Sequence, residues 1–322
     1  MSLPATSTRL SVGMLAAFAA IYFFWGTTYL AIAVAIRDIP PLISGSMRFV
    51  LAAFVMYVWL RWRDAKPLAN VDLKMAALAG VLLSGIGNGF VVWAQQGIPS
   101  GIAALTVAAM PVIVLLLDWA FFSKRAPTGQ ALLGTAVALI GVVTIVTHTR
   151  SISGEAHPLY VVALLLATVG WSFGTLIQKR VVQPGAVLSF TCAQMFFGGL
   201  FQLFLSVVDG EWAHFDPSAV TWSSLGAVAY LVVFGSILGL NCYLWLLTKV
   251  AAPKVATYAL VNPVVALLLG AAILGEPLTS LVIMATVLVL VGVGLVVFQG
   301  VLNPSRLRSF VSRRGPAIAP GE

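Results

Sequence analysis

Arg48 is the residue whose position points most directly to chemistry. It stands in an apolar run that follows Pro41 and carries no other charge before Arg61. A charge inside a membrane-spanning segment is costly and usually faces protein or a water-filled cavity. Arg48 therefore either binds an anionic group of a substrate or has a structural role. The structural role is open because, at about 1.5 Å per helical residue, Arg48 is near enough to the start of its segment to snorkel to the interface.

Two prolines, Pro111 and Pro263, lie deep in apolar runs of helical length. Proline lacks a backbone N–H and disrupts the preceding helical turn, which frees the carbonyls of Val107 and Ala259. A free carbonyl in a membrane is tolerated where a neighbour or cavity water satisfies it, and it would accept a hydrogen bond from a substrate ammonium group. The alternative is that the prolines only kink their helices and shape the bundle.

Aromatic and small polar side chains recur within the apolar runs. Trp and Tyr offer flat apolar walls with one polar handle, which suits a substrate cavity, although Trp near a helix end is more often an interface anchor. Together with Arg48, the expected substrate-binding residues are Trp25, Thr27, Thr28, Asn88, Trp93, Trp171, Ser172, Thr175, Gln178, Asn241, Trp245, Tyr258 and Asn262, with Tyr29, Gln95 and Tyr243 as further wall residues.

One motif resembles a catalytic one and is rejected. Residues 170–174 spell the Gly-x-Ser-x-Gly nucleophile pattern of hydrolases, but that motif requires a strand, a tight turn and a helix, whereas this stretch lies in an apolar run. The histidines fall near loops, and no Cys or His cluster has metal-ligand spacing. We expect no enzyme activity, no metal and no cofactor.

Composition and charge spacing predict an integral membrane protein. The chain is 60% hydrophobic and 9% charged, with a mean hydropathy of +1.02, whereas soluble domains are roughly 25% charged. One crossing of the bilayer takes about 20 apolar residues. The neutral stretches predict an all-α protein of ten transmembrane helices, near residues 12–35, 42–60, 75–95, 101–122, 129–147, 159–178, 187–208, 221–247, 255–274 and 279–299.

The basic residues predict the orientation of these helices. With both termini in the cytoplasm, 15 of the 18 Lys and Arg residues fall in cytoplasmic segments, and Asp209, Glu211 and Asp216 share an outer loop, as the positive-inside rule requires. The net charge of +8 then reflects topology and the anionic headgroups of the lipid bilayer, so we expect no nucleic-acid partner. Residues 1–11 are expected to be a cytoplasmic N-terminus and residues 303–322 a basic, disordered cytoplasmic tail.

The second half of the chain repeats the first. Trp93–Pro111 returns with the same spacing as Trp245–Pro263. Five spans in each half, over residues 12–147 and 159–299, would insert in opposite orientations, which is the inverted repeat of many secondary transporters. Corresponding residues include Trp25 and Trp171, Arg48 and Gln194, Gly85 and Gly235, and Gly89 and Gly239.

The residues at these positions resemble a known family. Trp25-Gly26-Thr27-Thr28, Met47-Arg48-Phe49, Val261-Asn262-Pro263 and Leu274-Gly275-Glu276-Pro277-Leu278 are similar to the signatures of EamA-type members of the drug/metabolite transporter (DMT) superfamily. The resemblance covers nearly all of residues 12–299 and implies a ten-helix, inverted-repeat exporter of small metabolites. Within the superfamily the chain is most similar to exporters of aromatic amino acids in bacterial inner membranes. One departure is Lys124-Arg125, where the first half often carries a Glu matching Glu276.

We therefore expect an inner-membrane exporter of amino acids, aromatic and other apolar ones among them, that works by alternating access to a central cavity. Because no acidic residue lies centrally in a span, transport without ion coupling is favoured. Two alternatives stay open: an exporter of lipophilic cations or other small metabolites or drugs, and a membrane scaffold that transports nothing. The substrate range and the oligomeric state, a monomer included, also stay open.

Overall fold

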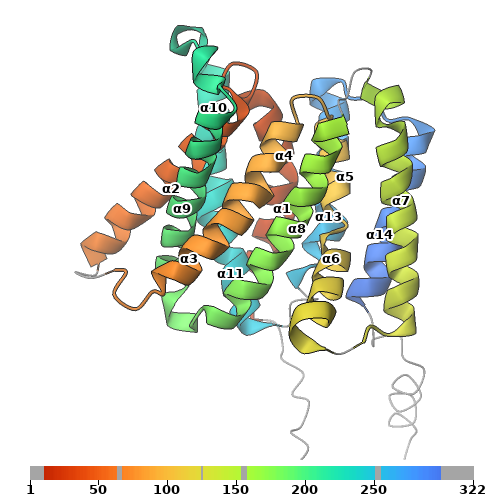
Figure 1. The fold of residues 1–322 in the computed structure, drawn as a ribbon, viewed down its shortest axis with the longest axis horizontal. Coiled ribbons are helices and arrows are strands. Elements are labelled where there is room, and N and C mark those ends of the chain that lie inside the picture. The colour runs from red at the N-terminus through yellow and green to blue at the C-terminus, as the bar shows by residue number, and fades with distance from the viewer. Residues whose placement is uncertain (1–10, 64–66, 125, 154–157, 251–254, 299–322) are drawn as a thin grey trace, which may run out of the picture.

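The computed structural model describes residues 11–63, 67–124, 126–153, 158–250 and 255–298 (Figure 1). All regular structure in these residues is helical, so the predicted all-α class is confirmed. Within the same ranges, nine helices are long and apolar enough to cross a membrane, and Tyr258–Leu274 forms a shorter apolar helix where the ninth span was expected. The predicted N-terminal residues 1–10 and the predicted tail at 303–322 lie outside the described residues.

The helices follow one another along the chain in the predicted order, and several spans are divided into segments of different helix type. The first half holds α1 (Val12–Ala35), α2 (Pro41–Arg63), α3 (Leu73–Ala79), η1 (Gly80–Asn88), α4 (Gly89–Ala94), α5 (Ser100–Val107), α6 (Met110–Leu117), η2 (Asp118–Ser123) and α7 (Gly129–Ser153). The second half holds α8 (Pro158–Val181), η3 (Pro184–Ala186), α9 (Val187–Val208), η4 (Glu211–Ala213), η5 (Pro217–Ala219), α10 (Trp222–Tyr230), η6 (Leu231–Leu238), α11 (Gly239–Lys249), α13 (Tyr258–Leu269), η7 (Gly270–Leu274) and α14 (Ser280–Val297).

Four of these segments are π-helical, and they occupy matching places in the two halves. The segments η1 and η6 lie in the middle of the third and eighth spans, while η2 and η7 end the fourth and ninth spans. Both terminal segments stop at a left-handed residue, Lys124 with φ 55° and Gly275 with φ 70°, which is a common way to end a helix. π-Helical turns are rare and concentrate at functional sites, so the middle of these spans is where a site is sought.

Several corresponding helices of the two halves pack against each other. α2 lies on α9, and α7 lies on α14 at one side of the bundle, while α1, α5, α8 and α13 contact one another or the π-helical segments near the centre (Figure 1). The α7–α14 contact is close because it is built on glycine: a Cβ added at Gly292 would lie 2.3 Å from the backbone nitrogen of Ala138. Small residues are the usual means of close helix packing in membranes.

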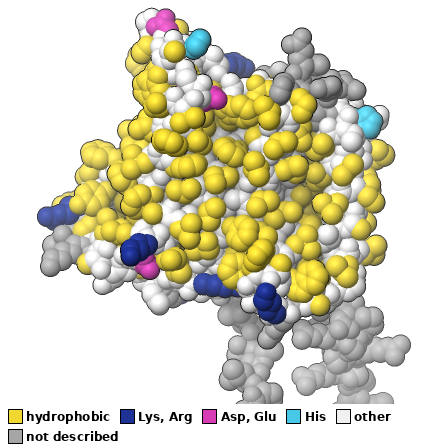
Figure 2. All heavy atoms as spheres, in the orientation of Figure 1, with side chains coloured by type: hydrophobic (Ala, Val, Ile, Leu, Met, Phe, Trp, Pro, Cys, Tyr) yellow, Lys and Arg dark blue, Asp and Glu magenta, His cyan; other side chains and the backbone are white. Residues whose placement is uncertain are grey.

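The surface is a broad apolar band with charges toward its two rims (Figure 2). We call one rim the basic end and the other the acidic end, although Arg37 lies at the acidic end and Asp72 and Asp118 at the basic end. The basic end carries Arg61, Arg63, Lys74, Lys124, Lys179, Arg180 and Lys249, and the acidic end carries Asp38, Asp209, Glu211, Asp216 and Glu276.

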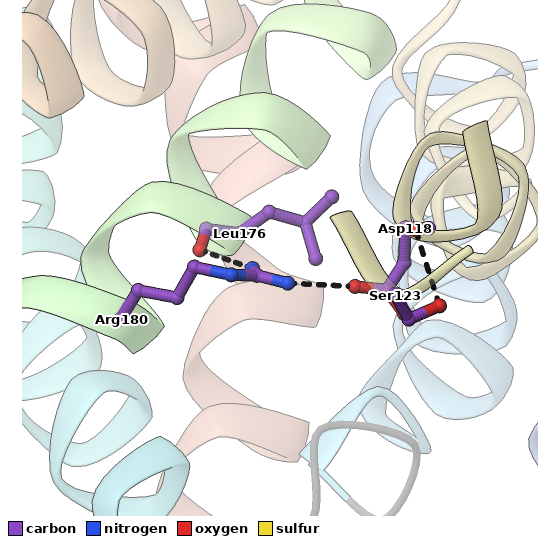
Figure 3. A network of polar contacts seen from close by, with 4 residues as sticks. All are labelled: Asp118, Ser123, Leu176 and Arg180. Atoms are coloured by element: carbon purple, nitrogen blue, oxygen red, sulfur yellow. Dashed lines mark hydrogen bonds and ion pairs between the residues drawn. The ribbon is translucent and has the colours of Figure 1, made fainter. Parts of the chain in front are cut away.

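An ion pair joins the two halves at the basic end. The Arg180 Nη2 atom lies 2.9 Å from Asp118 Oδ1, its Nη1 donates to the Leu176 carbonyl at 2.8 Å, and Ser123 Oγ donates to the Asp118 carbonyl (Figure 3). The paired side chains are 41% and 35% exposed. An ion pair this exposed contributes at most about 1 kcal/mol, so it is a weak tie between the halves.

Candidate functional site

A small cavity lies among the central helices, at the depth of the π-helical segments. Its volume is about 50 Å³, well below the roughly 300–1,000 Å³ of pockets that hold small-molecule ligands. In this conformation the cavity has room for water-sized molecules and must widen to admit a metabolite. It is lined by Trp25, Thr28, Tyr29, Ile32, Arg48, Gly87, Asn88, Val91, Val107, Trp171, Tyr258 and Asn262.

Arg48 is held in the cavity wall by the two central π-helical segments. Its Nε donates to Ser236 Oγ in η6 at 2.8 Å, and its Nη1 donates to Asn88 Oδ1 in η1 at 2.9 Å. The residue is 3% exposed, so its side chain is enclosed by protein rather than extended to the interface. Gly235 makes this possible, because a Cβ there would lie 2.8 Å from Arg48 Nη2.

The charge of Arg48 has no acidic partner among the hydrogen bonds and ion pairs of the described residues. Its guanidinium carbon lies 4.7 Å from the centre of the Phe49 ring, and a cation over an aromatic face gains only part of what an anion would supply. A buried charge is expensive unless it is paired. The hydrogen bonds found use two of the five guanidinium N–H groups, so the cavity wall presents a positive charge suited to an anionic group.

Four aromatic rings pack beside the cavity. The Trp25 ring centre lies 4.9 Å from that of Tyr258, 5.1 Å from that of Tyr243 and 5.5 Å from that of Trp171. Trp25, Trp171 and Tyr258 line the cavity, and Tyr243, from α11, packs against Trp25 and Tyr258. The cluster therefore forms an aromatic wall of the cavity.

The Trp25 side chain is held by a backbone carbonyl of the second half. Its indole Nε1 donates to the Gly235 carbonyl in η6 at 3.1 Å. A Cβ at Gly239 would lie only 2.2 Å from this nitrogen. The space at Gly235 and Gly239 thus admits the Trp25 and Arg48 side chains.

The two prolines differ in their effect on the chain. Before Pro111 the helix is interrupted at Ala108 and Ala109, between α5 and α6, and Val107 lines the cavity at this break. Pro111 has no N–H to give to the Val107 carbonyl, so that oxygen is available at the cavity wall. Pro263 instead lies inside α13.

Asn262, next to Pro263, ties α13 to α1. In the amide orientation that satisfies its surroundings, its nitrogen donates to the Tyr22 carbonyl at 3.1 Å and to the Tyr258 carbonyl at 3.3 Å. Asn262 therefore combines a place in the cavity wall with a bond between the two halves.

The cavity brings together part of the expected substrate-binding residues. Those that line it are Trp25, Thr28, Arg48, Asn88, Trp171, Tyr258 and Asn262. Those placed elsewhere are Thr27, Trp93, Ser172, Thr175, Gln178, Asn241 and Trp245.

Side-chain direction around each helix explains this division. Thr27 shares a hydrogen bond with the Tyr230 hydroxyl, whereas its neighbour Thr28 reaches the cavity. Ser172 donates to the Thr168 carbonyl one turn back at 2.7 Å, and Thr175 shares a hydrogen bond with Tyr243 at 2.8 Å.

Three others serve positions away from the cavity. Trp93 donates to Asp209 Oδ2 at 3.3 Å at the acidic end, Asn241 donates to the Ile237 carbonyl at 2.6 Å on a lateral apolar groove, and Gln178 is buried in α8.

Some lining residues were not expected from the sequence, among them Ile32, Gly87 and Val91. Ser236, which holds Arg48, was not expected either. Helical spacing carries the signal for two of them, because residues three or four apart share a helix face. Ile32 lies one and two turns beyond Thr28 and Trp25, and Val91 lies three residues beyond Asn88. Within the described ranges, no group of three or more His, Cys, Asp or Glu side chains is placed to hold a metal ion.

Comparisons with known proteins agree with this architecture. The profile of the EamA-like transporter family matches residues 11–147 and 158–298. The uncharacterized inner membrane transporter YedA of Escherichia coli K12 is 32% identical over 302 residues, which cover 94% of this chain and 93% of YedA. A probable amino-acid metabolite efflux pump of Salmonella typhimurium is 29% identical over 281 residues, 85% of this chain and 91% of the pump. One solved crystal structure aligns with a TM-score of 0.61 at 17% identity, over 89% of this chain and 96% of that chain, which indicates a shared fold.

Proposed function

The chain belongs to the EamA-like transporter family, and on that premise we propose that it exports amino acids, aromatic and other apolar ones among them, through the cavity at Arg48. The chain is a multi-pass inner membrane transporter, not an enzyme. The name of the Salmonella relative, a probable amino-acid metabolite efflux pump, supports the substrate class. The sequence resemblance to the aromatic amino acid exporter YddG supports it as well.

The buried, unpaired charge of Arg48 carries the proposal. The carboxylate of an amino acid would accept hydrogen bonds from the guanidinium N–H groups that Asn88 and Ser236 leave free. The ammonium group would donate to the Val107 carbonyl that Pro111 leaves without an N–H. The side chain would pack on the Trp25 and Trp171 rings once the cavity has widened.

The same charge argues against a lipophilic cation as the main substrate. A cation would have to enter a cavity whose lining includes Arg48 and, among the described residues, no Asp or Glu. Like charges at short range in a low-dielectric site repel strongly. A zwitterion brings its own negative group and avoids this cost.

The transport cycle we infer is alternating access between the two halves. Several helices that correspond in the two halves pack on each other, and π-helical segments recur at matching places, which supports inverted five-helix repeats over residues 12–147 and 159–299. The basic end would face the cytoplasm, with both chain termini on that side. Because the described residues that line the cavity include no carboxylate or histidine, we infer transport down the substrate gradient without ion coupling.

Counterflow in proteoliposomes tests the function. Vesicles loaded with unlabelled tryptophan should accumulate labelled tryptophan or phenylalanine, and a proton ionophore should leave the rate unchanged. Tryptamine, which lacks the carboxylate, should compete far less well than tryptophan. Stronger competition by tryptamine than by tryptophan would favour the cation exporter, and loss of counterflow with the ionophore would contradict the uncoupled cycle.

A further inference from the structure

Glu211, from the loop after α9 in the second half, holds the N-terminus of α2 in the first half. Its two carboxylate oxygens accept from the backbone nitrogens of Leu42 at 2.9 Å and Ile43 at 2.8 Å. The first N–H groups of a helix have no partner within the helix, and a carboxylate there also meets the positive end of the helix dipole. Glu211 is 8% exposed, and α2 is the helix that carries Arg48.

Glu276 does the same for α5. It follows η7 in the second half, and its oxygens accept from Ser100 N at 2.6 Å and Gly101 N at 3.1 Å in the first half. Gly270 leaves the space that the carboxylate fills, since a Cβ there would lie 2.3 Å from Glu276 Oε2. α5 ends at Val107, which lines the cavity.

A third acidic residue makes the reciprocal contact. Asp38, in the loop between α1 and α2, accepts from Thr221 N at 3.1 Å and from Ser224 Oγ at 2.7 Å at the start of α10. α10 continues into η6, which carries Ser236, the acceptor of the Arg48 Nε bond. Each of the three acids thus reaches across to the other half of the chain, and all three lie at the acidic end.

We propose that Glu211 and Glu276 are positioning residues that hold the two substrate-binding helices α2 and α5 from the opposite half. The hydrogen bonds of both carboxylates to these helices break when the acidic end opens. Each bond joins a second-half loop to a first-half helix, so it breaks if opening of the acidic end moves that loop away from that helix. The same separation frees the helices that carry Arg48 and Val107. Opening of the acidic end and loosening of the substrate contacts are therefore one event. The proposal rests on the proposed function only in taking Arg48 and Val107 as substrate contacts.

The test is the rate at which a cysteine near the acidic end is labelled. In a background without Cys192 and Cys242, Ile32→Cys places a thiol in the cavity wall, and a charged maleimide reports its access in the full chain in nanodiscs. Removing either carboxylate, by Glu211→Ala or Glu276→Ala, should raise the labelling rate at least threefold.

Two controls distinguish the loss of these carboxylate bonds from a general loosening of the protein. Asp216→Ala removes an acid of the same end whose side-chain bonds to the described residues stay within its own loop, at Ser218 and Ala219, and should leave the labelling rate at the wild-type value. A reporter at Ala17→Cys, buried in α1 toward the basic end, should not be labelled faster in any variant. An equal rise at Ala17 and Ile32 would overturn the proposal.

A backbone variant covers the case in which an alanine variant does not fold. Ser100→Pro removes one N–H that Glu276 binds, at the first position of α5, where proline is well tolerated. It should raise labelling at Ile32→Cys as Glu276→Ala does. Unchanged labelling in folded alanine variants and in folded Ser100→Pro would refute the proposal. Because labelling requires no substrate, a failure of amino acid counterflow would leave this result standing.

Discussion

Arg48 and Ser236 lie in opposite halves of the chain and are joined by a 2.8 Å hydrogen bond from the arginine Nε to the serine Oγ. Ser236 is fully buried in the π-helical segment η6, and Asn88 in η1 binds the same guanidinium from the first half. The charge in the cavity is thus oriented by both halves at once. A change in how the halves meet changes the direction of the guanidinium.

Replacing Arg48 should weaken substrate binding more than it lowers the amount of folded protein. A hydrogen bond to a charged group contributes about 1.5–3 kcal/mol, so Arg48→Ala should raise the half-saturation concentration about 10- to 100-fold. Arg48→Lys keeps the charge but loses the planar fork and should be intermediate. Counterflow at several tryptophan concentrations measures this, with Arg37→Ala, an exposed arginine at the acidic end, as the control. An unchanged half-saturation concentration in Arg48→Ala would remove Arg48 from the binding site.

The space at Gly239 should be needed and the space at Gly226 should not. Both glycines lie in the same membrane span, but an alanine Cβ at Gly239 would collide with Trp25 Nε1, whereas nothing lies within 4 Å at Gly226. Overpacking typically costs about 1–3 kcal/mol, so Gly239→Ala should lower the unfolding temperature and the counterflow rate. Gly226→Ala should be neutral or stabilise by up to about 1 kcal/mol, because alanine favours helix. Equal unfolding temperatures in the two variants would show that Trp25 is not held at this position.

Pro111 should matter for the substrate ammonium group. Pro111→Ala supplies an N–H that can bond the Val107 carbonyl and close the break between α5 and α6. The half-saturation concentration for tryptophan should then rise, while that for indole propionate, which has no ammonium group, should change little. Equal effects on both compounds would assign Pro111 a role in helix shape only.

The access of the cavity from the acidic end should fall as the pH is lowered from neutral toward 4.5. Burial raises the pKa of Glu211 above its ordinary 4.5, helped by nearby Asp209 and opposed by the bonds from Leu42 and Ile43. The closed form therefore binds a proton more tightly than an open form in which Glu211 is hydrated, so acid favours the closed form and base the open one. Hydrogen bonds from Thr221 and Ser224 lower the pKa of Asp38, which places its opposing effect below pH 4.

Labelling of Ile32→Cys at pH 5, 6 and 7, corrected for thiolate reactivity with a free thiol, measures this dependence. Glu211→Gln cannot titrate and should abolish it. A dependence that survives in Glu211→Gln would have to come from another group.

The sequence by itself determined the helical class, the approximate limits of the spans and the presence of one intramembrane charge. Long apolar runs leave the backbone no partner except itself, so each run must become a helix, and the breaks between runs follow from charged and Gly- or Pro-containing segments. The ninth span is the exception to the predicted limits, because its helix begins at Tyr258 and is shorter than the expected 255–274.

Only the tertiary structure decided which side chains meet. Thr27 and Thr28 are neighbours of equal polarity, yet only Thr28 lines the cavity, because about 100° of helix rotation separates them and packing alone sets that rotation. The Arg48–Ser236 bond and the caps from Glu211 and Glu276 each join residues more than 150 positions apart. No local pattern encodes these pairings, since they arise only when the two halves pack on each other.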